Sequence, residues 1–272
     1  MSSRSSRRDL QKEFEQYRIR SAHANAAYKV PFDGDHLFVK VYGPKKPRIP
    51  YEIRKALGVI GIRQPVEYRS PSRRRDFEKD ILRHWNDHGY HVPAFVENPF
   101  HRLSHLPVLT TRYIKGVTIR DLLRSERVKT AEKEKQLAVL FRDTGERHRV
   151  ALRSGDNRLF HIDANTRNVI LAEDTLYHCD FEMGRPWESP VQCAAREVLK
   201  LLISLIEDMG TSCAEPVCRT FRGVYTEKTV YTGIAKGITG RPFQGIHRFN
   251  DRRKKKREPG RVTLYDILRF LS

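Results

Sequence analysis

The chain has 272 residues, enough for one large domain or for two lobes with a substantial hydrophobic core. Apolar residues make up 39% and charged residues 31%, a balance that excludes a disordered chain. The formal net charge is +19, so the surface attracts polyanions such as nucleic acid, phosphorylated glycolipid or an anionic membrane face, and charge alone does not choose among them.

The first half of the chain predicts a small, strand-rich lobe. Residues 1–10 are rich in serine and arginine and are expected to be disordered. Alternating and β-branched stretches predict strands at 17–20, 28–32, 36–42, 92–97 and 108–113. Asp33-Gly34-Asp35 predicts the turn of a hairpin whose second strand carries Lys40. Residues 43–75, rich in proline, arginine and lysine, predict a basic insert with a short helix near 51–57.

A helix at 76–88 completes this half. Its apolar residues fall at helical spacing, and Gly89 is a suitable terminator. These apolar residues are Phe77, Ile81, Leu82 and Trp85.

The second half predicts a larger helical lobe. Helices are expected at 118–123 and 131–152, from Ser189-Pro190 to Gly210, and from Thr263 onward, where Asp266 completes a capping box. Three short strand-like pieces stand between them, at 159–162, 169–171 and 176–180. The expected organisation is an N-terminal lobe at 1–112, a connector near 111–117, and a C-terminal lobe at 113–272 that includes a basic loop at 251–260.

Nothing in the sequence predicts secretion or a membrane span. The N-terminus lacks the apolar core of a secretory signal. The longest apolar run, Val198 to Ile206, is interrupted by Lys200 and Ser204 and is far shorter than the roughly 20 residues that a span needs. The four cysteines form no C-x-x-C pair and suit a reducing compartment. A cytoplasmic protein is expected, with peripheral contact at the inner face of the membrane as an option.

The strongest signal for chemistry is a set of polar residues at fixed spacing. His161, Asp163 and Asn168 form the pattern H-x-D-x-x-x-x-N, which is followed by a strand, a turn, a strand and then Asp180-Phe181-Glu182. Phosphoryl transfer from ATP needs a base near the acceptor hydroxyl and hard oxygen ligands for Mg²⁺. The pattern predicts Asp163 as catalytic base and Asn168 and Asp180 as magnesium ligands, with His161 bracing the loop.

These two motifs, HIDANTRNVIL and CDFEMG, resemble the catalytic and metal loops of the protein-kinase-like superfamily. Within it they are most similar to the bacterial lipopolysaccharide core kinases, the Kdo and heptose kinases. Asn165 and Glu182 favour that group, because protein-serine kinases prefer lysine and glycine there. The small atypical protein kinases of the RIO and tRNA-modification types are the nearest competitor. The resemblance covers roughly residues 28–206 and implies an α+β, two-lobed fold with a small antiparallel-sheet N-lobe and a larger helical C-lobe.

The resemblance also implies an ATP site. Lys40 in LFVKVY matches the strand lysine that holds the α and β phosphates, and Glu78 is its expected helix partner, with Glu52 and Glu67 as weaker alternatives. Backbone groups near Thr111 and Tyr113 would meet adenine. The predicted nucleotide-binding set is Lys40, Glu78, Thr111, Tyr113, Asn168 and Asp180, with ATP and Mg²⁺ as cofactors.

The sequence departs from the family pattern in three places. No G-x-G-x-x-G is present, and the segment expected to cover the phosphates reads SAHANAAY. Ala164 replaces the usual leucine after the catalytic aspartate, and Arg196 stands where relatives often show a carboxylate. The missing glycine motif weakens the protein-kinase reading more than it weakens the fold.

The leading hypothesis is therefore an ATP-dependent kinase that phosphorylates a hydroxyl of a lipopolysaccharide core sugar or related anionic glycan. Basic clusters at Arg69, 73–75 and 252–257 are expected to contact such an acceptor or an anionic membrane surface. An atypical serine/threonine protein kinase and a polyanion-binding pseudokinase remain alternatives. Nucleic acid ranks lower, because the basic stretches lack interleaved aromatic residues. The acceptor and the oligomeric state stay open.

Overall fold

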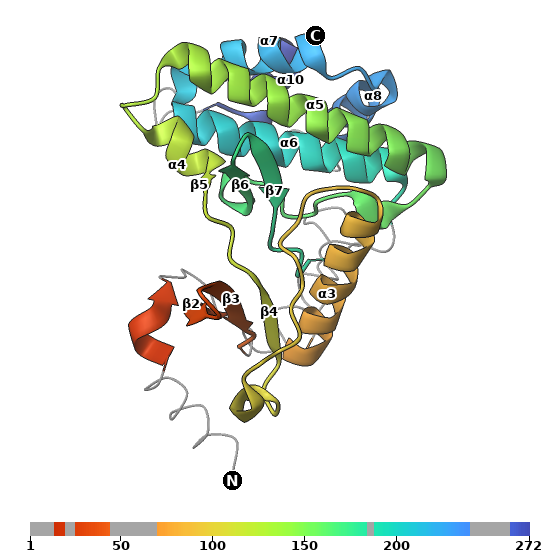
Figure 1. The fold of residues 1–272 in the computed structure, drawn as a ribbon. Helices are drawn as coiled ribbons and strands as arrows, with labels where there is room; N and C mark the ends of the chain where they lie inside the picture. Colours follow the sequence, from red (N-terminus) through yellow and green to blue (C-terminus); the bar gives the residue numbers. More distant parts are fainter. Residues whose placement is uncertain (1–13, 20–24, 44–69, 184–187, 240–261) are drawn as a thin grey trace.

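The computed structural model describes residues 14–19, 25–43, 70–183, 188–239 and 262–272. Several predictions lie outside the described residues: the disordered start at 1–10, most of the basic insert 43–75 with Glu52, Glu67 and Arg69, and the basic loop at 252–257. The described chain forms a small sheet and a larger group of helices, joined by one long helix and by the strand that leaves the sheet (Figure 1). The predicted α+β class, with a small antiparallel-sheet lobe and a larger helical lobe, is confirmed.

The small lobe is built on one antiparallel sheet with the strand order β1-β2-β3-β4. Its strands are β1 (Arg18–Ile19), β2 (Ala26–Phe32), β3 (Asp35–Val41) and β4 (Val108–Arg112). A two-residue turn joins β2 to β3, and both of its residues, Asp33 and Gly34, have positive φ angles of 48° and 73°. Such angles are what a tight hairpin turn requires, and they are why the Asp-Gly pair predicted it.

Alternation along β3 separates its two faces. Leu37, Val39 and Val41 are buried in an apolar cluster with β2 and the segment before β4. Lys40 points to the opposite face because successive side chains of a strand alternate. It is nevertheless buried, with 7% of its surface exposed, so it is no solvated surface lysine.

Helix α3 (Pro71–Asp87) connects the two lobes. Ser70 caps it and Pro71 opens it, five residues before the predicted start. One face of α3 is buried along its whole length. The residues of this face are Arg74, Glu78, Ile81, Leu82 and Trp85. The polar pair lies toward the sheet, and Trp85 packs against Tyr90, His161, His178 and Phe181 of the larger lobe's core.

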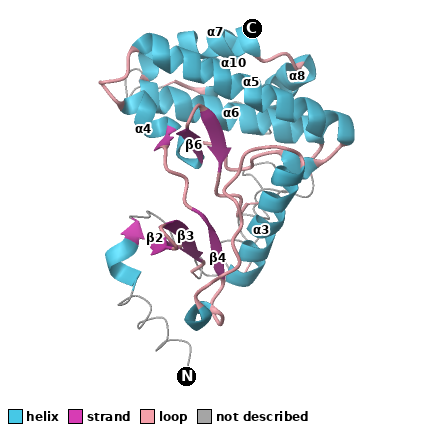
Figure 2. Ribbon diagram, in the orientation of Figure 1, coloured by secondary structure: helices cyan, strands magenta, loops and turns pink. Residues whose placement is uncertain are grey.

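The larger lobe is mainly helical, as Figure 2 shows. Its helices are α4 (Ile119–Arg124), α5 (Thr130–Ser154), α6 (Pro190–Met209), α7 (Ala214–Val224), α8 (Lys228–Thr239) and α10 (Leu264–Leu271). A second antiparallel sheet has the order β5-β6-β7, with β5 (Val117–Thr118), β6 (Val169–Ala172) and β7 (Thr175–His178). Short 3-10 turns complete the described chain: η1 (Glu15–Tyr17), η2 (His101–Leu103), η3 (Asn157–Leu159), η4 (Thr166–Asn168) and η5 (Thr211–Cys213).

Helix α6 lies at the centre of this lobe. It packs against α4, α5, α7 and α8, and ten of its residues are buried. The predicted capping box at the start of α10 is present, formed by Thr263 and Asp266. Ser189 caps α6 as predicted, and Gln192 completes a capping box there that was not predicted.

Two predicted strands are wrong. Residues 92–97 form only a single bridge, Phe95 to Thr111, because Pro93 has no N–H to donate to a ladder. Residues 159–162 form the end of η3 and a loop, since the His161 N–H donates to the Glu197 carboxylate instead of to a neighbouring strand.

Helices α7 and α8 were not predicted. The apolar residues of α7 nevertheless fall at i, i+3, i+4 and i+7, a pattern typical of a helix. They are Ala214, Val217, Cys218 and Phe221. A membrane-spanning helix was not expected, and none of the helices in the described ranges has the length and apolar character to cross a bilayer.

Candidate active site

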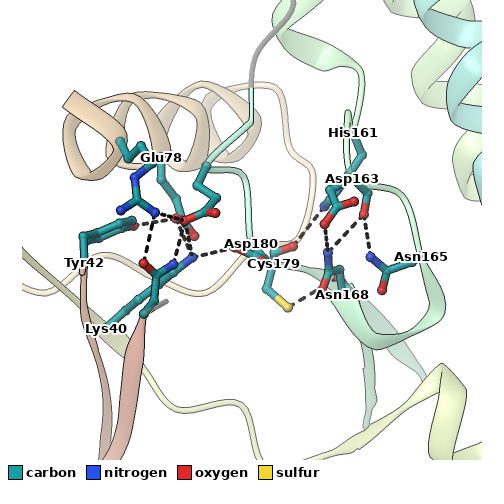
Figure 3. A network of polar contacts seen from close by, with 12 residues as sticks. Lys40, Tyr42, Glu78, His161, Asp163, Asn165, Asn168, Cys179 and Asp180 are labelled. Atoms are coloured by element: carbon teal, nitrogen blue, oxygen red, sulfur yellow. Dashed lines mark hydrogen bonds and ion pairs between the residues drawn. The ribbon is translucent and has the colours of Figure 1, made fainter. Parts of the chain in front are cut away.

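Two clusters of polar side chains meet where the lobes face each other (Figure 3). The first contains Lys40 from β3 and Glu78 from α3, whose Nζ and Oε2 atoms lie 2.8 Å apart. Lys40 Nζ also lies 2.5 Å from Asp180 Oδ1, and the hydroxyl of Tyr42 donates to Glu78 Oε2 at 2.5 Å. Glu78, the glutamate favoured from the sequence, is thus the helix glutamate that pairs with Lys40 in the described part of the chain.

Electrostatics keep this lysine charged. Burial opposes its charge, but the carboxylates of Glu78, Asp180 and Glu182 outweigh that effect and raise the pKa of Lys40 well above its ordinary value. Burial likewise opposes the charge of Asp180, and Lys40 outweighs it and holds the pKa of Asp180 below its usual range. Both groups therefore stay ionised at neutral pH.

The backbone at Asp180 is strained. Its φ angle is +67°, a left-handed conformation that costs a non-glycine residue about 1–3 kcal/mol and that clusters at functional sites. The adjacent Cys179 is held on both sides of its peptide, because its N–H donates to the Asn168 carbonyl at 2.9 Å and its carbonyl accepts from His161 Nε2 at 2.9 Å. These bonds fix the point from which the Asp180 carboxylate turns toward Lys40.

Glu182 has a partner set of its own. Arg74 Nη1 donates to Glu182 Oε2 at 3.0 Å and to Asn25 Oδ1 at 3.0 Å, while Asn25 Nδ2 donates to the same Glu182 oxygen at 2.6 Å. Arg74 is 1% exposed and also donates to the Gly43 carbonyl. Glu182 therefore connects the segment after Asp180 to α3 and to the residue before β2. Its carboxylate thus has a structural role.

The second cluster is the loop that carries Asp163. Asn168 Nδ2 donates to the Asp163 carbonyl at 3.0 Å and lies 3.5 Å from Asp163 Oδ2. Asn165 Nδ2 also donates to the Asp163 carbonyl at 3.0 Å, and its Oδ1 accepts from the Arg167 N–H. The turn η4 thus brings Asn168 back beside Asp163, and Figure 3 shows this pair next to Asp180.

His161 braces this loop. Its Nε2–H donates to the Cys179 carbonyl, and its backbone N–H donates to Glu197 Oε2 at 2.8 Å. Burial lowers the pKa of His161 to about 4, so the ring is neutral at physiological pH. It therefore links the Asp163 loop to the Asp180 loop, in agreement with the bracing role expected from the sequence.

Helix α6 supports the whole Asp163 loop through side-chain hydrogen bonds. Four polar residues of α6 face it, at spacings of three, four and four residues. They are Glu197, Lys200, Ser204 and Asp208. Glu197 accepts from the His161 N–H, Lys200 donates to Asp163 Oδ1, Ser204 Oγ accepts from the Thr166 N–H at 3.1 Å, and Asp208 accepts from the Thr166 hydroxyl.

Glu197 is fully engaged in this arrangement. Its two oxygens accept from Arg147 Nη1 and Nη2 at 3.2 and 2.5 Å, from His148 Nε2 at 2.9 Å, and from the His161 N–H. Burial opposes its charge, but Arg147 and His148 outweigh burial and hold the pKa of Glu197 far below its usual range. His148 is neutral, because burial lowers its pKa, and its Nδ1 accepts from the Tyr225 hydroxyl.

The residues present fit a magnesium ion bound to a nucleotide. The N–H₂ group of the Asn168 amide donates to Asp163, which leaves Asn168 Oδ1 as the atom able to bind a cation. Asp180 is near enough to this pair for the charge of Asp163 to act on its carboxylate. Glu78, Asp180 and Glu182 also have ligand atoms within 4.8 Å of one another. The Lys40 ammonium lies among these three carboxylates, so they suit a lysine better than a bare ion.

A separate group of residues with metal-ligating side chains lies away from this site, at the end of α3. It contains His84, His88 and Asp156, and His84 Nε2 lies 2.8 Å from Asp156 Oδ2. Both oxygens of Asp156 already accept from the Arg158 guanidinium, at 3.0 and 2.8 Å. A metal here would have to displace that arginine, so the cluster is better described as an ion-paired corner between α3 and η3.

The predicted adenine contacts lie at the end of β4. Thr111 is buried within the sheet, and the Tyr113 N–H donates to the His36 carbonyl at 3.1 Å. The Arg112 N–H is also used, by the Ala94 carbonyl. A backbone donor to adenine in this segment would therefore have to come from beyond Tyr113, and the roles of Thr111 and Tyr113 stay predictions.

Sequence reasoning missed the supporting residues on α6 and on α5. Their signal was present: Lys200 and Ser204 interrupt the apolar run of α6, and Glu197 and Asp208 continue the same face at helical spacing. Arg147 and His148 carry no such pattern, because nothing in sequence links two polar residues inside α5 to a carboxylate 50 positions later.

Comparisons with known proteins add little to this geometry. No protein-family model matches the chain, and no curated protein matches it. Among solved structures 533 chains match. One of them, described as WaaP in complex with acyl carrier protein, is 16% identical, with 78% of this chain and 82% of that chain covered and a TM-score of 0.44. A likeness at that level assigns no activity to the chain.

Proposed function

We propose that this protein is an ATP-dependent phosphotransferase that transfers the γ-phosphoryl group to a hydroxyl group. One observation carries the proposal: Lys40 and Glu78 from the small lobe meet Asp180, which lies beside the pair formed by Asp163 and Asn168. These side chains come from four separate parts of the sequence. Their convergence supplies a phosphate-binding cation, two hard oxygen ligands and a carboxylate base, the set that phosphoryl transfer requires.

Each residue has a defined task in this proposal. Lys40, oriented by Glu78, would hold the α and β phosphates, while Asn168 and Asp180 would hold Mg²⁺. The bound ion would neutralise charge on the phosphates. Asp163 would accept the proton of the acceptor hydroxyl: Lys200 outweighs the opposing effect of burial and keeps the pKa of this carboxyl below its usual range, so it is ionised and ready to accept.

For the acceptor we propose a sugar hydroxyl of an anionic glycan such as the lipopolysaccharide core. The support is the net charge of +19 together with Lys200 beside the base and the exposed Arg167 on the same loop. The resemblance of the two loop motifs to the lipopolysaccharide core kinases points the same way. Asn165, bound to its own loop, differs from the lysine that protein-serine kinases favour there.

The first experiment tests the base. Asp163→Asn keeps the size of the side chain and removes its charge, and it should lower magnesium-dependent transfer from ATP by at least about 1,000-fold with the fold intact. Asp174→Asn is the control, since Asp174 is exposed in the turn between β6 and β7. Undiminished transfer by Asp163→Asn would reject Asp163 as the base.

The second experiment tests the acceptor. Purified lipopolysaccharide core and a pool of purified proteins are offered side by side with radiolabelled ATP. Label in the glycan alone supports the proposed acceptor, whereas label in protein alone favours an atypical protein kinase. An absence of Mg·ATP binding in calorimetry would reject the enzyme and leave a polyanion-binding pseudokinase.

A further inference from the structure

The Asp163 carboxylate carries a cation that does not come from its own loop. Lys200, on the middle of α6, donates through Nζ to Asp163 Oδ1 and to the Ile162 carbonyl at 3.3 Å. An ammonium group has three N–H donors, so one of them remains after these two bonds. Some 40% of the Lys200 side chain is exposed, so its head is not sealed inside the helical lobe.

The loop has a cation of its own, Arg167, but that side chain is exposed, and the ion pair of Asp163 in the described part of the chain is with Lys200 instead. Asn165 is neutral, and both ends of its amide are bound to loop backbone. His161 is buried and bound to the Cys179 carbonyl. Lys40 is committed to the carboxylates of the nucleotide side. In the part of the chain that the structure describes, Lys200 is the cation that forms an ion pair with Asp163.

The position of Lys200 matters because of where the reaction takes place. The base must lie within hydrogen-bonding distance of the attacking hydroxyl, and that hydroxyl approaches the γ-phosphorus in line with the leaving oxygen. A cation in contact with the base therefore lies close to the equatorial oxygens of the phosphoryl group during its transfer. Those oxygens carry the negative charge of the transition state, and a fixed cation aimed at them lowers the barrier.

We propose that Lys200 is a catalytic residue that binds the transferred phosphoryl group, supplied by α6 in place of a cation from the catalytic loop. This inference rests on the proposed function and deepens it.

In the step itself, the acceptor oxygen forms a bond to the γ-phosphorus and the bond from that phosphorus to the β-γ bridging oxygen breaks. The acceptor proton passes to Asp163, and ADP leaves with the bridging oxygen. Lys200 contributes one N–H to an equatorial oxygen while its bond to the Ile162 carbonyl keeps the side chain in place.

The test needs no acceptor. Calorimetry on the full chain measures the affinity for Mg·ADP with and without fluoroaluminate, which mimics the planar phosphoryl group. Lys200→Met should bind Mg·ADP as the wild type does but lose about 100-fold of the gain that fluoroaluminate gives. Lys200→Arg should recover part of that gain. Arg196→Met is the matched control: it removes a cation from the same helix, one that pairs with Glu188 instead.

A double variant separates contact with the phosphoryl group from support of the base. If Lys200 acts only by holding Asp163, then Lys200→Met adds nothing in an Asp163→Asn background. If it binds the phosphoryl group, the loss of fluoroaluminate affinity persists there. Three results would overturn the inference while leaving Mg·ADP binding intact. Fluoroaluminate could raise the affinity of Lys200→Met for Mg·ADP as much as it does for the wild type, or it could fail to raise the affinity of the wild type. The loss of fluoroaluminate affinity could also disappear in the double variant. A wild type that does not bind Mg·ADP overturns the proposed function as well.

Discussion

Two buried glutamates, Glu78 and Glu197, hold the two halves of this site in different ways. Each stands on a helix, each faces a cation, and each is about 3% exposed. Glu78 uses one oxygen, Oε2, to accept from both Lys40 and Tyr42. Lys40 also pairs with Asp180, whose side chain is 38% exposed. Glu197 uses both oxygens on four donors in the interior of the helical lobe.

The two sides differ in which of their ion pairs and hydrogen bonds a bound ligand can replace. On the Glu78 side, cations and carboxylates from both lobes are paired with each other, and phosphates with their metal ion can take over some of those pairings. On the Glu197 side the four donors to the carboxylate all come from one lobe, so none of these bonds needs to change when a substrate arrives. Under the proposed function, the nucleotide side is thus adjustable and the catalytic loop is preorganised.

The largest expected effect lies on the Glu197 side and concerns stability. Glu197→Gln leaves the fully buried Arg147 guanidinium without its carboxylate, and breaking a buried pair in this way costs about 3–5 kcal/mol of unfolding free energy. Urea denaturation measures it. Glu207→Gln, exposed on the same helix, should change stability by less than about 0.5 kcal/mol. A Glu197→Gln protein as stable as the wild type would contradict the preorganised loop.

Glu78→Gln should sharpen the contrast by affecting activity more than stability. Lys40 keeps Asp180 as a partner, so the fold survives, but the lysine loses a charge-assisted bond worth about 1.5–3 kcal/mol. The expected loss is about 10- to 100-fold in kcat/KM for Mg·ATP. Asp76→Asn, exposed on the same helix, serves as the control. If Glu78→Gln unfolded the protein as Glu197→Gln does, the two sides would not differ as described.

The sequence could predict the residues to which we assign the chemistry in our proposal, and not those that support them. Lys40, Asp163, Asn168 and Asp180 sit in short motifs, where spacing along the chain fixes spacing in the site. Glu78 was chosen among three glutamates only because it lies on the first turns of a helix predicted by its apolar spacing. The fold class followed from the same patterns, since strands gathered before residue 113 and helices after it.

The residues that were missed act across long sequence separations. Glu197 binds Arg147 from 50 residues away and His161 from 36, and no local pattern encodes such a contact. The two wrong strands, at 92–97 and 159–162, failed for a similar reason, because apolar residues there serve tertiary packing without a neighbouring ladder. Among the sequence patterns, the polar residues spaced along one face of α6 came closest to predicting the supporting residues.

The pH dependence of stability should also differ between the two sides. His161, bonded to Glu197 through its N–H, has a pKa of about 4, below its ordinary value of 6.5. The unfolded chain therefore binds this proton more readily, so the stabilisation is complete above pH 6.5 and is lost as the pH falls toward 4. Between pH 6.5 and 5, before carboxylates titrate, the loss from this group is about 2 kcal/mol.

His161→Gln isolates that contribution. Glutamine can still donate to the Cys179 carbonyl but does not titrate, so its stability curve should be flatter than that of the wild type by about 2 kcal/mol between pH 6.5 and 5. Denaturant titrations at each pH measure the difference. His105→Gln, at an exposed position, controls for the loss of a histidine. Parallel curves for wild type and His161→Gln would show that His161 titrates normally.

The smallest expected effect tests whether α6 holds the loop by neutral bonds as well as charged ones. Ser204→Ala removes the acceptor of the Thr166 N–H and the hydrogen bond between the two hydroxyl groups at 2.9 Å, while Asp208 still accepts from the Thr166 hydroxyl. The loss of these two neutral hydrogen bonds costs about 1–2 kcal/mol. Because η4 carries Asn168, the loosened turn should also lower kcat about threefold with the KM for ATP unchanged. Ser212→Ala, exposed in η5, is the matched control. A rise in KM with kcat unchanged would instead place Ser204 in support of the adjustable nucleotide side.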